Sequence, residues 1–510
     1  MNKHGSFFTT TLTVTLLIVV GKLLGFGRET LIAGFYGATA ETDALFFAQS
    51  MPAMIFPAVC SSVSTAFISL YTARLATEDP RSSDRYASRT LLATSILASV
   101  LAVIGVLLSP ILVPLFAPGF QGSQLSLAIR LTRLTMGMFL ITMMQYMLGA
   151  ILNSHKYFIG SQVAGLFYNL VIILVTVFLG PGQSMEVLML TIILGHAAQL
   201  VCLIYCCHGC FHLTLRLNPL HQEIKQLWTL SLPILLGNSV VQLNTIVDKA
   251  LGSILPEGSL SALSYGNTLT ALITSIFIMS LSTVLYPTLT SNAASGDMDQ
   301  YGQILMKNLS GLTLLLIPIS CITLLFAQDI VKIVYGRGNF DQTAVANTGA
   351  VLACYAPIFL FSGIREILSR VFFSLQDTKT PMQNSAIGVG CNILFSLLLV
   401  HPLGIKGIAL GTTISALITT CLMLWSVCRE LPTLPIKCFF RETFAKGLLA
   451  AGILLVLLWG LRCSILFSAP LLRFVCATVL GGTAYLCILL ILREPTLRAL
   501  LRQLFHKDSD

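Results

Sequence analysis

Charge is scarce in this sequence. Only 10% of its 510 residues are Asp, Glu, Lys or Arg, whereas 55% are hydrophobic, and the mean hydropathy is +0.86. Apolar blocks of about 20 residues, long enough to cross a bilayer, recur from one end to the other, and no soluble domain of any size fits between them. Because backbone groups in lipid must be satisfied within each segment, the composition predicts an all-α polytopic membrane protein.

Signatures of enzymes and of nucleic-acid binders are also missing. The sequence has no Walker loop GxxxxGK[ST], which excludes nucleotide hydrolysis by that route. Its net charge of +9 does not come from a basic stripe with interleaved aromatic residues, so nucleic-acid binding is not predicted. The pair Asp297-x-Asp299 has a spacing that binds a metal and a sugar diphosphate in some glycosyltransferases, but helix capping explains it more simply. We therefore expect no enzyme activity and no cofactor.

The cysteines form no recognisable framework. The 14 cysteines lack an even spacing and mostly lie inside apolar blocks, as small buried hydrophobic residues do. One cluster, CCHGCFH at residues 206–212, contains metal-binding residue types, but no second ligand pair follows at a finger-like spacing. The sequence therefore predicts neither disulfides nor a metal site.

The apolar blocks predict about fourteen transmembrane helices. Proline, glycine or charged residues separate blocks of about 20 to 30 residues. The first block, MNKHGSFFTTTLTVTLLIVV, begins like a signal peptide but lacks a small-residue cleavage site, so we expect it to be the first span. An even number of spans would leave both termini on one side of the membrane.

Basic residues in alternate loops predict which side that is. One set of loops, together with the C-terminal tail, contains Arg74, Arg81, Arg85, Arg89, Lys156, Arg216, Lys225, Lys379, Arg429, Lys437, Arg441, Arg493, Arg498, Arg502 and Lys507. The opposite loops GATAE, APGFQGSQ, GPGQS and LPEGS contain no Lys or Arg. By the positive-inside rule the first set and both termini are cytoplasmic. A minority goes against the pattern: Lys332, Arg337, Lys406, Arg462 and Arg473.

The chain also contains a weak internal repeat. The segments LNSHKYFIGSQVAGLFYNLVIILV and LQDTKTPMQNSAIGVGCNILFSLL align with Lys156 over Lys379 and Asn169 over Asn392, both 223 residues apart. An even number of spans in each repeat keeps the two copies parallel. We expect two six-helix lobes, at residues 1–215 and 216–432, followed by two extra helices and a basic tail at residues 433–510. Paired lobes around a central site are a recurring plan of alternating-access transporters.

Charged residues inside the first two spans indicate a binding site. A charge near the bilayer centre costs roughly 2.5 to 3.5 kcal/mol on insertion scales, so Lys22, Arg28, Glu29 and Asp43 need a reason to be there. They snorkel from positions near the ends of the spans, pair with one another, or line a cavity. The same alternatives apply to later intramembrane charges: Arg130, Arg133, Asp248, Lys249, Arg365, Glu366 and Arg370. For Arg28 we expect Asp43 as the partner, in a cationic cavity that suits an anionic amphiphile better than a cationic drug.

Helix-breaking residues lie next to these charges. Gly25 and Gly27 lie between Lys22 and Arg28 in the first span, and such glycines weaken a helix or allow it to bend. Pro233 interrupts a later span in the same way. We expect these three positions to act as hinges.

Seven motifs resemble a known family. In order along the chain they are KLLGFGRETLIAGFYGATAETDALFFAQSMPAMIF, LFAPGF, GAILNSHKYF, LYPTLTSNAASGD, YGRGNFD, FFSLQDTKTP and PLGIKGIALGTTISA. They are similar to successive signatures of the MurJ (MviN) lipid II flippase family, within the multidrug/oligosaccharidyl-lipid/polysaccharide exporter superfamily. The resemblance runs from about Lys22 to about Ala416, and seven motifs in sequence are far more specific than one.

The resemblance implies a fold, a location and a substrate. It implies fourteen helices in a bacterial cytoplasmic (inner) membrane, with a cationic cavity between two lobes and a lipid-holding groove at the last two helices. The implied activity is translocation of the undecaprenyl-diphosphate-linked peptidoglycan precursor, lipid II, from the inner to the outer leaflet by alternating access. With no nucleotide site visible, an ion gradient or the membrane potential is the expected driving force.

The resemblance also implies site residues. The basic residues of the family's first helix fall on Lys22 and Arg28, and its acidic residue of the second helix falls on Asp43. Better-known members have Arg in place of Lys22, and their further arginines align with Phe56 and Thr268. Arg365 and Arg370 are candidates to supply the cationic contacts that these two positions lack.

Other functions remain open at this stage. A flippase of the same superfamily can carry another polyprenyl-linked polysaccharide, and related proteins export drugs. A non-transporting membrane scaffold for envelope assembly is a further alternative, although cavity charges argue against it.

Overall fold

A computed structural model shows an all-helical chain. It describes residues 3–214, 222–276, 298–432, 434, 436–463 and 469–499, of which 3–11, 53–55, 222, 236–241 and 299 are described by their backbone alone. Within these ranges the chain forms helices joined by short turns, and no strand is present. The whole LYPTLTSNAASGD motif, which ends at Asp297, lies outside the described residues. The predicted all-α class is confirmed.

Eleven spans are long and apolar enough to cross a membrane within the described part of the chain. Eight are single helices: α2 (Ala40–Thr77), α3 (Pro80–Phe116), α6 (Phe158–Leu179), α7 (Met185–Cys207), α10 (Met298–Tyr335), α13 (Lys379–Leu403), α14 (Ile405–Glu430) and α17 (Pro470–Ile491). A ninth span consists of α15 (Ile436–Cys438), η1 (Phe439–Phe444) and α16 (Ala445–Cys463) in succession. Two are pairs of helices broken in the middle: α4 (Gly122–Gly137) with α5 (Phe139–Ser154), and α11 (Gln342–Tyr355) with α12 (Ile358–Ser374).

Three further helices are not among these eleven. They are α1 (Lys3–Tyr36), α8 (Gln222–Ser253) and the helix at residues 259–276. The charges of Arg28 and Glu29 in α1 and of Asp248 and Lys249 in α8 lower the hydropathy of their segments. In the described part of the chain the structure therefore shows a multi-pass membrane protein with about eleven recognisable spans, and these three helices make up the difference from the fourteen predicted.

The helix ends are satisfied by local chemistry. Thr39 caps α2 in a capping box with Thr42, and Ser184 and Asp341 accept backbone hydrogen bonds at the starts of α7 and α11. Pro80 begins α3, where its missing N–H costs nothing. Each cap supplies partners for backbone groups that a helix end leaves unpaired.

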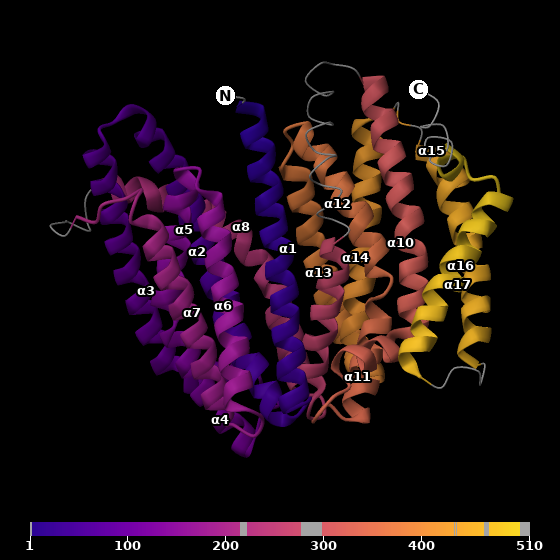
Figure 1. Ribbon diagram of the computed structural model, residues 1–510, viewed down its shortest axis with the longest axis horizontal. Helices are drawn as coiled ribbons and strands as arrows, with labels where there is room; N and C mark the ends of the chain where they lie inside the picture. The colour runs from indigo at the N-terminus through magenta and orange to yellow at the C-terminus, as the bar shows by residue number, and fades with distance from the viewer. Residues whose placement is uncertain are drawn as a thin grey trace. The chain divides into compact units, whose positions relative to one another are not determined.

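The chain divides into two compact units. Unit 1 comprises Met1–Ser261 with Gly338–Phe340, and unit 2 comprises Ala262–Arg337 with Asp341–Asp510. In unit 1, α2 packs against α4, α5 and α8, and α6 packs against α1 and α7. Figure 1 shows α1 running beside α6.

The end of α1 is closed by a distant segment of unit 1. The backbone N–H of Asn339 donates to the carbonyl of Gly34 at 2.9 Å, and the Asn339 amide Nδ2 donates to the carbonyl of Phe35 at 2.6 Å. Gly37 follows with a φ of +69°, and a Cβ there would lie 2.5 Å from the Asn339 carbonyl oxygen. Glycine is therefore required by both conformation and space.

Unit 2 is built around α10. This helix packs against α11, α12, α16 and α17, and α13 pairs with α14. The shared core includes Leu309, Phe326, Phe359, Leu454 and Tyr485, which are all buried. The last two long helices thus pack on α10 as part of unit 2.

Candidate functional site

Arg28 of α1 lies at the centre of a polar cluster in unit 1. Its Nη2 donates to Glu29 Oε1 at 2.6 Å, and its Nη1 donates to Asn169 Oδ1 of α6 at 3.2 Å. Its guanidinium carbon lies 5.1 Å from the ring centroid of Tyr168. The Arg28 side chain is 18% exposed. A carboxylate, an amide and an aromatic ring thus hold the cation of α1 in a fixed orientation.

The glycines of α1 have different surroundings. A Cβ at Gly25 would lie 3.6 Å from Asn169 Oδ1, an ordinary contact, so Gly25 faces the amide that binds Arg28. A Cβ at Gly27 would meet nothing within 4 Å. The helix runs without interruption through both positions. The predicted hinge role of these glycines, and of Pro233 at an exposed position in α8, stays a prediction.

Lys22 and Glu29, two further charges of α1, have opposite exposures. Lys22 is exposed. Glu29 is only 9% exposed, and its Oε2 has no hydrogen-bond partner among the described residues. The ion pair with Arg28 therefore uses one oxygen of a buried carboxylate and leaves the other one unmatched.

Asp43 does not pair with Arg28, so that prediction is wrong. Its Oδ2 accepts from the backbone N–H of Gly258 at 2.7 Å, and its Oδ1 accepts from the backbone N–H and the hydroxyl of Ser261, both at 2.6 Å. Asp43 is 3% exposed. Backbone donors from a turn 215 residues away satisfy this carboxylate, and Glu29, the residue next to Arg28 in sequence, takes the expected place of Asp43 as its partner.

A cavity of about 390 Å³ adjoins the Arg28 cluster, because Tyr168 lines it. The cavity lies within unit 1, among α2, α4, α5, α6 and α7. Its polar lining residues are Gln49, Thr135, Thr142, Gln145, His196 and Gln199. Its other lining residues are Pro52, Phe56, Pro57, Met138, Tyr146, Tyr168 and Ile192.

Part of this lining is fixed by internal hydrogen bonds. Gln145 Nε2 donates to the carbonyl of His196 at 2.7 Å, and Gln145 Oε1 lies 3.3 Å from His196 Nδ1. The rings of His196 and Tyr168 have centroids 4.4 Å apart. His196 is therefore a satisfied polar residue, as expected of a lone histidine in an apolar span.

The two positions where arginines were expected contain residues with other roles. Phe56 is buried, lines the cavity and stacks on Phe139 with a centroid distance of 3.7 Å. Thr268 lies in the helix at residues 259–276, and its hydroxyl donates to the carbonyl of Ser264 at 3.0 Å. Neither position contributes positive charge.

The remaining predicted cations belong to unit 2. Arg365 and Arg370 both lie on α12 and are half-buried. Arg370 pairs with Glu366 one turn earlier, with Nη2 2.5 Å from Oε1. No ion pair with Arg365 is found among the described residues.

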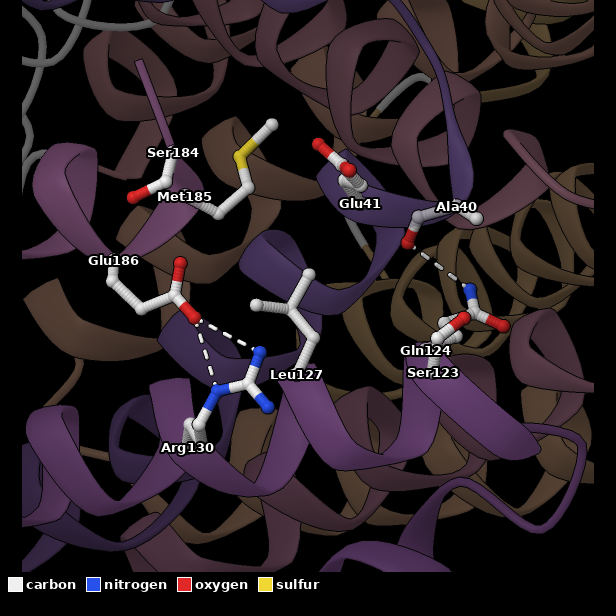
Figure 2. A pocket seen from close by; sticks show the side chains of 9 residues that line it. All are labelled: Ala40, Glu41, Ser123, Gln124, Leu127, Arg130, Ser184, Met185 and Glu186. Atoms are coloured by element: carbon white, nitrogen blue, oxygen red, sulfur yellow. Dashed lines mark hydrogen bonds and ion pairs between the residues drawn. The ribbon is translucent and has the colours of Figure 1, made fainter.

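A second, smaller pocket of unit 1 lies where three helices begin. It has a volume of about 220 Å³ and is lined by residues at or near the N-terminal ends of α2, α4 and α7. Figure 2 shows Arg130 turned toward Glu186, with Nη2 3.0 Å from the carboxylate, and Gln124 donating to the carbonyl of Ala40. Because Arg130 is paired with Glu186, it does not give this pocket a net positive charge.

Sequence reasoning missed the amides of the large cavity. Gln49 lies within the first of the seven motifs but was not assigned a role, and Gln145 and Gln199 lie in none of them. The signal that could have found them is polar residues within apolar spans, such as His196 and Gln199 three residues apart on one helix face. The cluster at residues 206–212 contains metal-binding residue types, and the sequence predicts no metal site there. In the described part of the chain, no group of three or more His, Cys, Asp or Glu residues is placed to hold a metal ion.

Comparisons with known proteins identify relatives along almost the whole chain. A family model described as "Lipid II flippase MurJ" matches residues 32–480. The probable lipid II flippase MurJ of Treponema pallidum is 26% identical over 459 residues, covering 88% of this chain and 86% of that protein. The probable lipid II flippase MurJ of Vibrio cholerae is 26% identical over 501 residues, covering 94% and 95%.

Solved structures share the fold. A lipid II flippase MurJ in an inward closed conformation matches with a TM-score of 0.81 and 23% identity, over 96% of this chain and 100% of that chain. An inward-facing multidrug resistance MATE transporter matches with a TM-score of 0.69 and 14% identity, over 80% and 94%. Since the family model covers most of its length and the relatives align nearly end to end, this chain belongs to the lipid II flippase MurJ family.

Proposed function

We propose that this protein is a flippase that moves lipid II from the inner to the outer leaflet of the bacterial cytoplasmic membrane. The observation that carries the proposal is Arg28, a cation held inside a membrane helix by Glu29, Asn169 and Tyr168. A large anionic head group cannot cross hydrocarbon, so a transporter must offer it cations and polar partners while the prenyl tail stays in lipid. Membership of the MurJ family supports lipid II as the cargo.

Arg28 is suited to the diphosphate of this substrate. A guanidinium has five N–H donors in a planar fork that matches phosphate oxygens, and the bonds to Glu29 and Asn169 use two of them. In the low dielectric of the membrane interior such charge-assisted bonds are strong. Glu29 stabilises the Arg28 cation while the site is empty. Lys22, six residues before Arg28, adds a point charge.

Arg365 and Arg370 form the second part of the proposed cationic set. Both lie on α12, and only Arg370 pairs with a carboxylate, Glu366, in the described part of unit 2. They compensate for the positions Phe56 and Thr268, which carry no charge. Asp43 positions the turn at residues 258–261 through its three hydrogen bonds, so its part in substrate handling is indirect.

Fourteen spans complete the proposed topology. In addition to the eleven recognisable spans, α1, α8 and the helix at residues 259–276 cross the membrane. Two six-helix lobes at residues 1–215 and 216–432 precede the segment 433–510, and both termini are cytoplasmic. The element order supports the lobes: α4, α5 and α7 begin at residues 122, 139 and 185, and α11, α12 and α14 begin at 342, 358 and 405, which is 219 or 220 residues later.

Transport proceeds by alternating access. Gly25, Gly27 and Pro233 are the proposed hinges, because glycine and proline weaken the helices in which they lie. No Walker loop is present to couple transport to nucleotide hydrolysis, so an ion gradient or the membrane potential supplies the energy.

Depletion of the protein in its native host tests the function. We expect lipid II to accumulate in the inner leaflet, measured by the accessibility of its head group to a reagent that stays outside the cell. Re-expression of the wild-type chain restores the outer-leaflet pool. If lipid II reaches the outer leaflet at a normal rate and no other flippase compensates, the proposal is wrong; accumulation of another polyprenyl-linked glycan instead would identify the cargo as that glycan.

A further inference from the structure

The cavity of about 390 Å³ in unit 1 has the dimensions of a ligand site that the diphosphate does not occupy. Small-molecule pockets typically have volumes of about 300 to 1,000 Å³. None of the residues that line this cavity is Asp, Glu, Lys or Arg. A group that is neutral and polar therefore suits it better than a phosphate, which needs cationic partners.

The lining combines aromatic surfaces with hydrogen-bonding groups. Phe56, Tyr146 and Tyr168 contribute rings, and Gln49 and Gln199 contribute amides. A sugar ring has apolar C–H faces and hydroxyl groups at its edge, so it packs against aromatic rings and exchanges hydrogen bonds with amides. A lipid tail would leave these amides unpaired, at a cost that hydrocarbon cannot offset.

Two of the amides are available to a ligand. Gln49 on α2 and Gln199 on α7 are half-buried, and neither side chain has a hydrogen-bond partner among the described residues. Gln145, in contrast, is fixed by two contacts with His196, and together these two residues form part of the cavity wall. The cavity thus has a rigid wall together with amide groups that a bound molecule can satisfy.

The position of the cavity connects it to Arg28. Tyr168 lines the cavity, and its ring lies 5.1 Å from the Arg28 guanidinium carbon. In a polyprenyl-diphosphate-linked glycan the first sugar is bonded directly to the diphosphate. A diphosphate at Arg28 therefore places that sugar beside Tyr168.

We propose that this cavity binds the carbohydrate part of the head group, with Gln49 and Gln199 as hydrogen-bonding partners and the rings of Tyr146 and Tyr168 as packing surfaces. The proposal rests on the proposed flippase function and assigns the recognition of sugar to unit 1. It makes Gln49 and Gln199 determinants of specificity, separate from the cation that binds the diphosphate.

Binding of two lipids that differ only in their sugars tests the proposal. Full-length protein in nanodiscs of defined composition is titrated with lipid II and with undecaprenyl diphosphate, which has no sugar. The wild-type chain is expected to prefer lipid II. The double variant Gln49→Leu with Gln199→Leu is expected to lose about tenfold in lipid II affinity, because two hydrogen bonds are removed, with no change for undecaprenyl diphosphate.

Gln162→Leu is the matched control. Gln162 is also a half-buried amide in unit 1, on α6, but it does not line the cavity, so both affinities should stay at the wild-type value. Tyr146→Leu is a second variant, which keeps both amides and removes one ring, and it should also weaken lipid II alone. Thermal unfolding of each variant checks that it is folded.

The outcomes separate the two proposals. Unchanged lipid II affinity in both the double variant and Tyr146→Leu, or equal weakening of both lipids, overturns the carbohydrate site and leaves the flippase function standing. A wild-type chain that binds neither lipid overturns the function and the site together.

Discussion

At the scale of single residues, the contacts of Arg28 explain why arginine occupies this position. Its planar fork reaches Glu29 along its own helix and Asn169 on α6 at the same time. A lysine presents one compact ammonium and cannot make both contacts in a fixed plane. Lys22 is exposed, so a flexible point charge is sufficient there.

Replacing Arg28 should impair transport. Arg28→Ala is expected to lower lipid II affinity about 10- to 100-fold, because a hydrogen bond to a charged group contributes about 1.5 to 3 kcal/mol. The lipid II affinity of Arg28→Lys should lie between that of the wild type and that of Arg28→Ala, since lysine retains the charge and loses the planar fork of donors. Flipping in proteoliposomes and binding in nanodiscs measure the effect. Arg133→Ala, which removes an exposed arginine of α4, is the control, and equal behaviour of the two alanine variants would contradict the assignment.

Asp43 is expected to matter for stability more than for binding. Asp43→Asn replaces one acceptor oxygen by a donor, opposite the N–H groups of Gly258 and Ser261. We expect the free energy of unfolding to fall by about 1 to 3 kcal/mol, the cost of leaving buried groups unpaired. Thermal unfolding of the purified protein measures this. Asp79→Asn is the matched control, because the Asp79 side chain makes no capping hydrogen bond at the start of α3, and an equal loss there would count against the prediction.

His155, in the turn after α5, should make stability depend on pH. Burial lowers the pKa of His155 below its usual value of 6.5, and the nearby Asp84 only partly opposes this. The unfolded chain therefore binds a proton more readily, so this residue costs stability as the pH falls through about 6.5 and costs none at higher pH. The melting temperature should drop from pH 7.5 to pH 5.5, and His155→Gln should reduce that drop. Identical pH profiles for the two proteins would refute the role of His155.

At the scale of elements, small residues allow α13 and α14 to approach closely. A Cβ at Gly407 of α14 would lie 2.1 Å from the Leu399 carbonyl oxygen, and one at Gly411 would lie 2.6 Å from Ser396 Oγ and 2.8 Å from its backbone nitrogen. Spacing of small residues by four is typical of membrane helix pairs, which pack by van der Waals contact without a hydrophobic driving force.

Gly411→Val should separate this helix pair. The added side chain would collide with the backbone of α13, which cannot yield as a flexible side chain does, so we expect destabilisation of about 1 to 3 kcal/mol or more. The melting temperature of the detergent-purified protein reports it. Gly390→Val on α13 is the control, because a Cβ there would meet nothing within 4 Å. If both variants have the melting temperature of the wild type, close packing at Gly411 does not contribute to stability.

Helices were more predictable than their contacts. Hydropathy identified most spans, and the caps at Thr39, Ser184 and Asp341 use residue types that sequence rules recognise. The turns at Lys156 and Gln376 were not predictable, since both residues have a φ of +62° without being glycine. In both turns the residue that follows donates to a carbonyl five residues earlier, a motif set by the backbone and not by residue type.

The candidate site was predictable only in part. The cation was found because a charge in an apolar span is conspicuous, but its contact with Asn169 joins residues 141 positions apart, which no local pattern indicates. The wrong choice of Asp43 as partner has the same origin: sequence shows which charges exist but not which backbone donors a buried carboxylate faces. Amides such as Gln49 and Gln199 were missed because a neutral polar residue does not stand out in a long span.

At the scale of the whole molecule, the number of spans decides where the termini lie. Eleven crossings would put the two ends of the chain on opposite sides of the membrane, whereas fourteen would put them on the same side. In both cases the loops at residues 155–157 and 375–378, which lie at Lys156 and next to Lys379, are on the same side as the C-terminus, and the loop at 180–184, which contains no Lys or Arg, is on the opposite side. By the positive-inside rule the C-terminal side is expected to be cytoplasmic, so the side of the N-terminus distinguishes the two numbers.

Reporter fusions distinguish these topologies. Alkaline phosphatase, which is active only outside the cytoplasm, should be active when fused after Gly182 and inactive when fused after Lys156 or at the C-terminus. A cytoplasm-active fluorescent reporter at the same sites should give the inverse pattern, which controls for expression. An inactive phosphatase at the C-terminus, together with an N-terminal tag that is accessible from outside the cell, would require an odd number of spans. That result would mean that at least one of α1, α8 and the helix at residues 259–276 does not cross, and since α1 carries Arg28, the position of the proposed diphosphate site within the membrane depends on it.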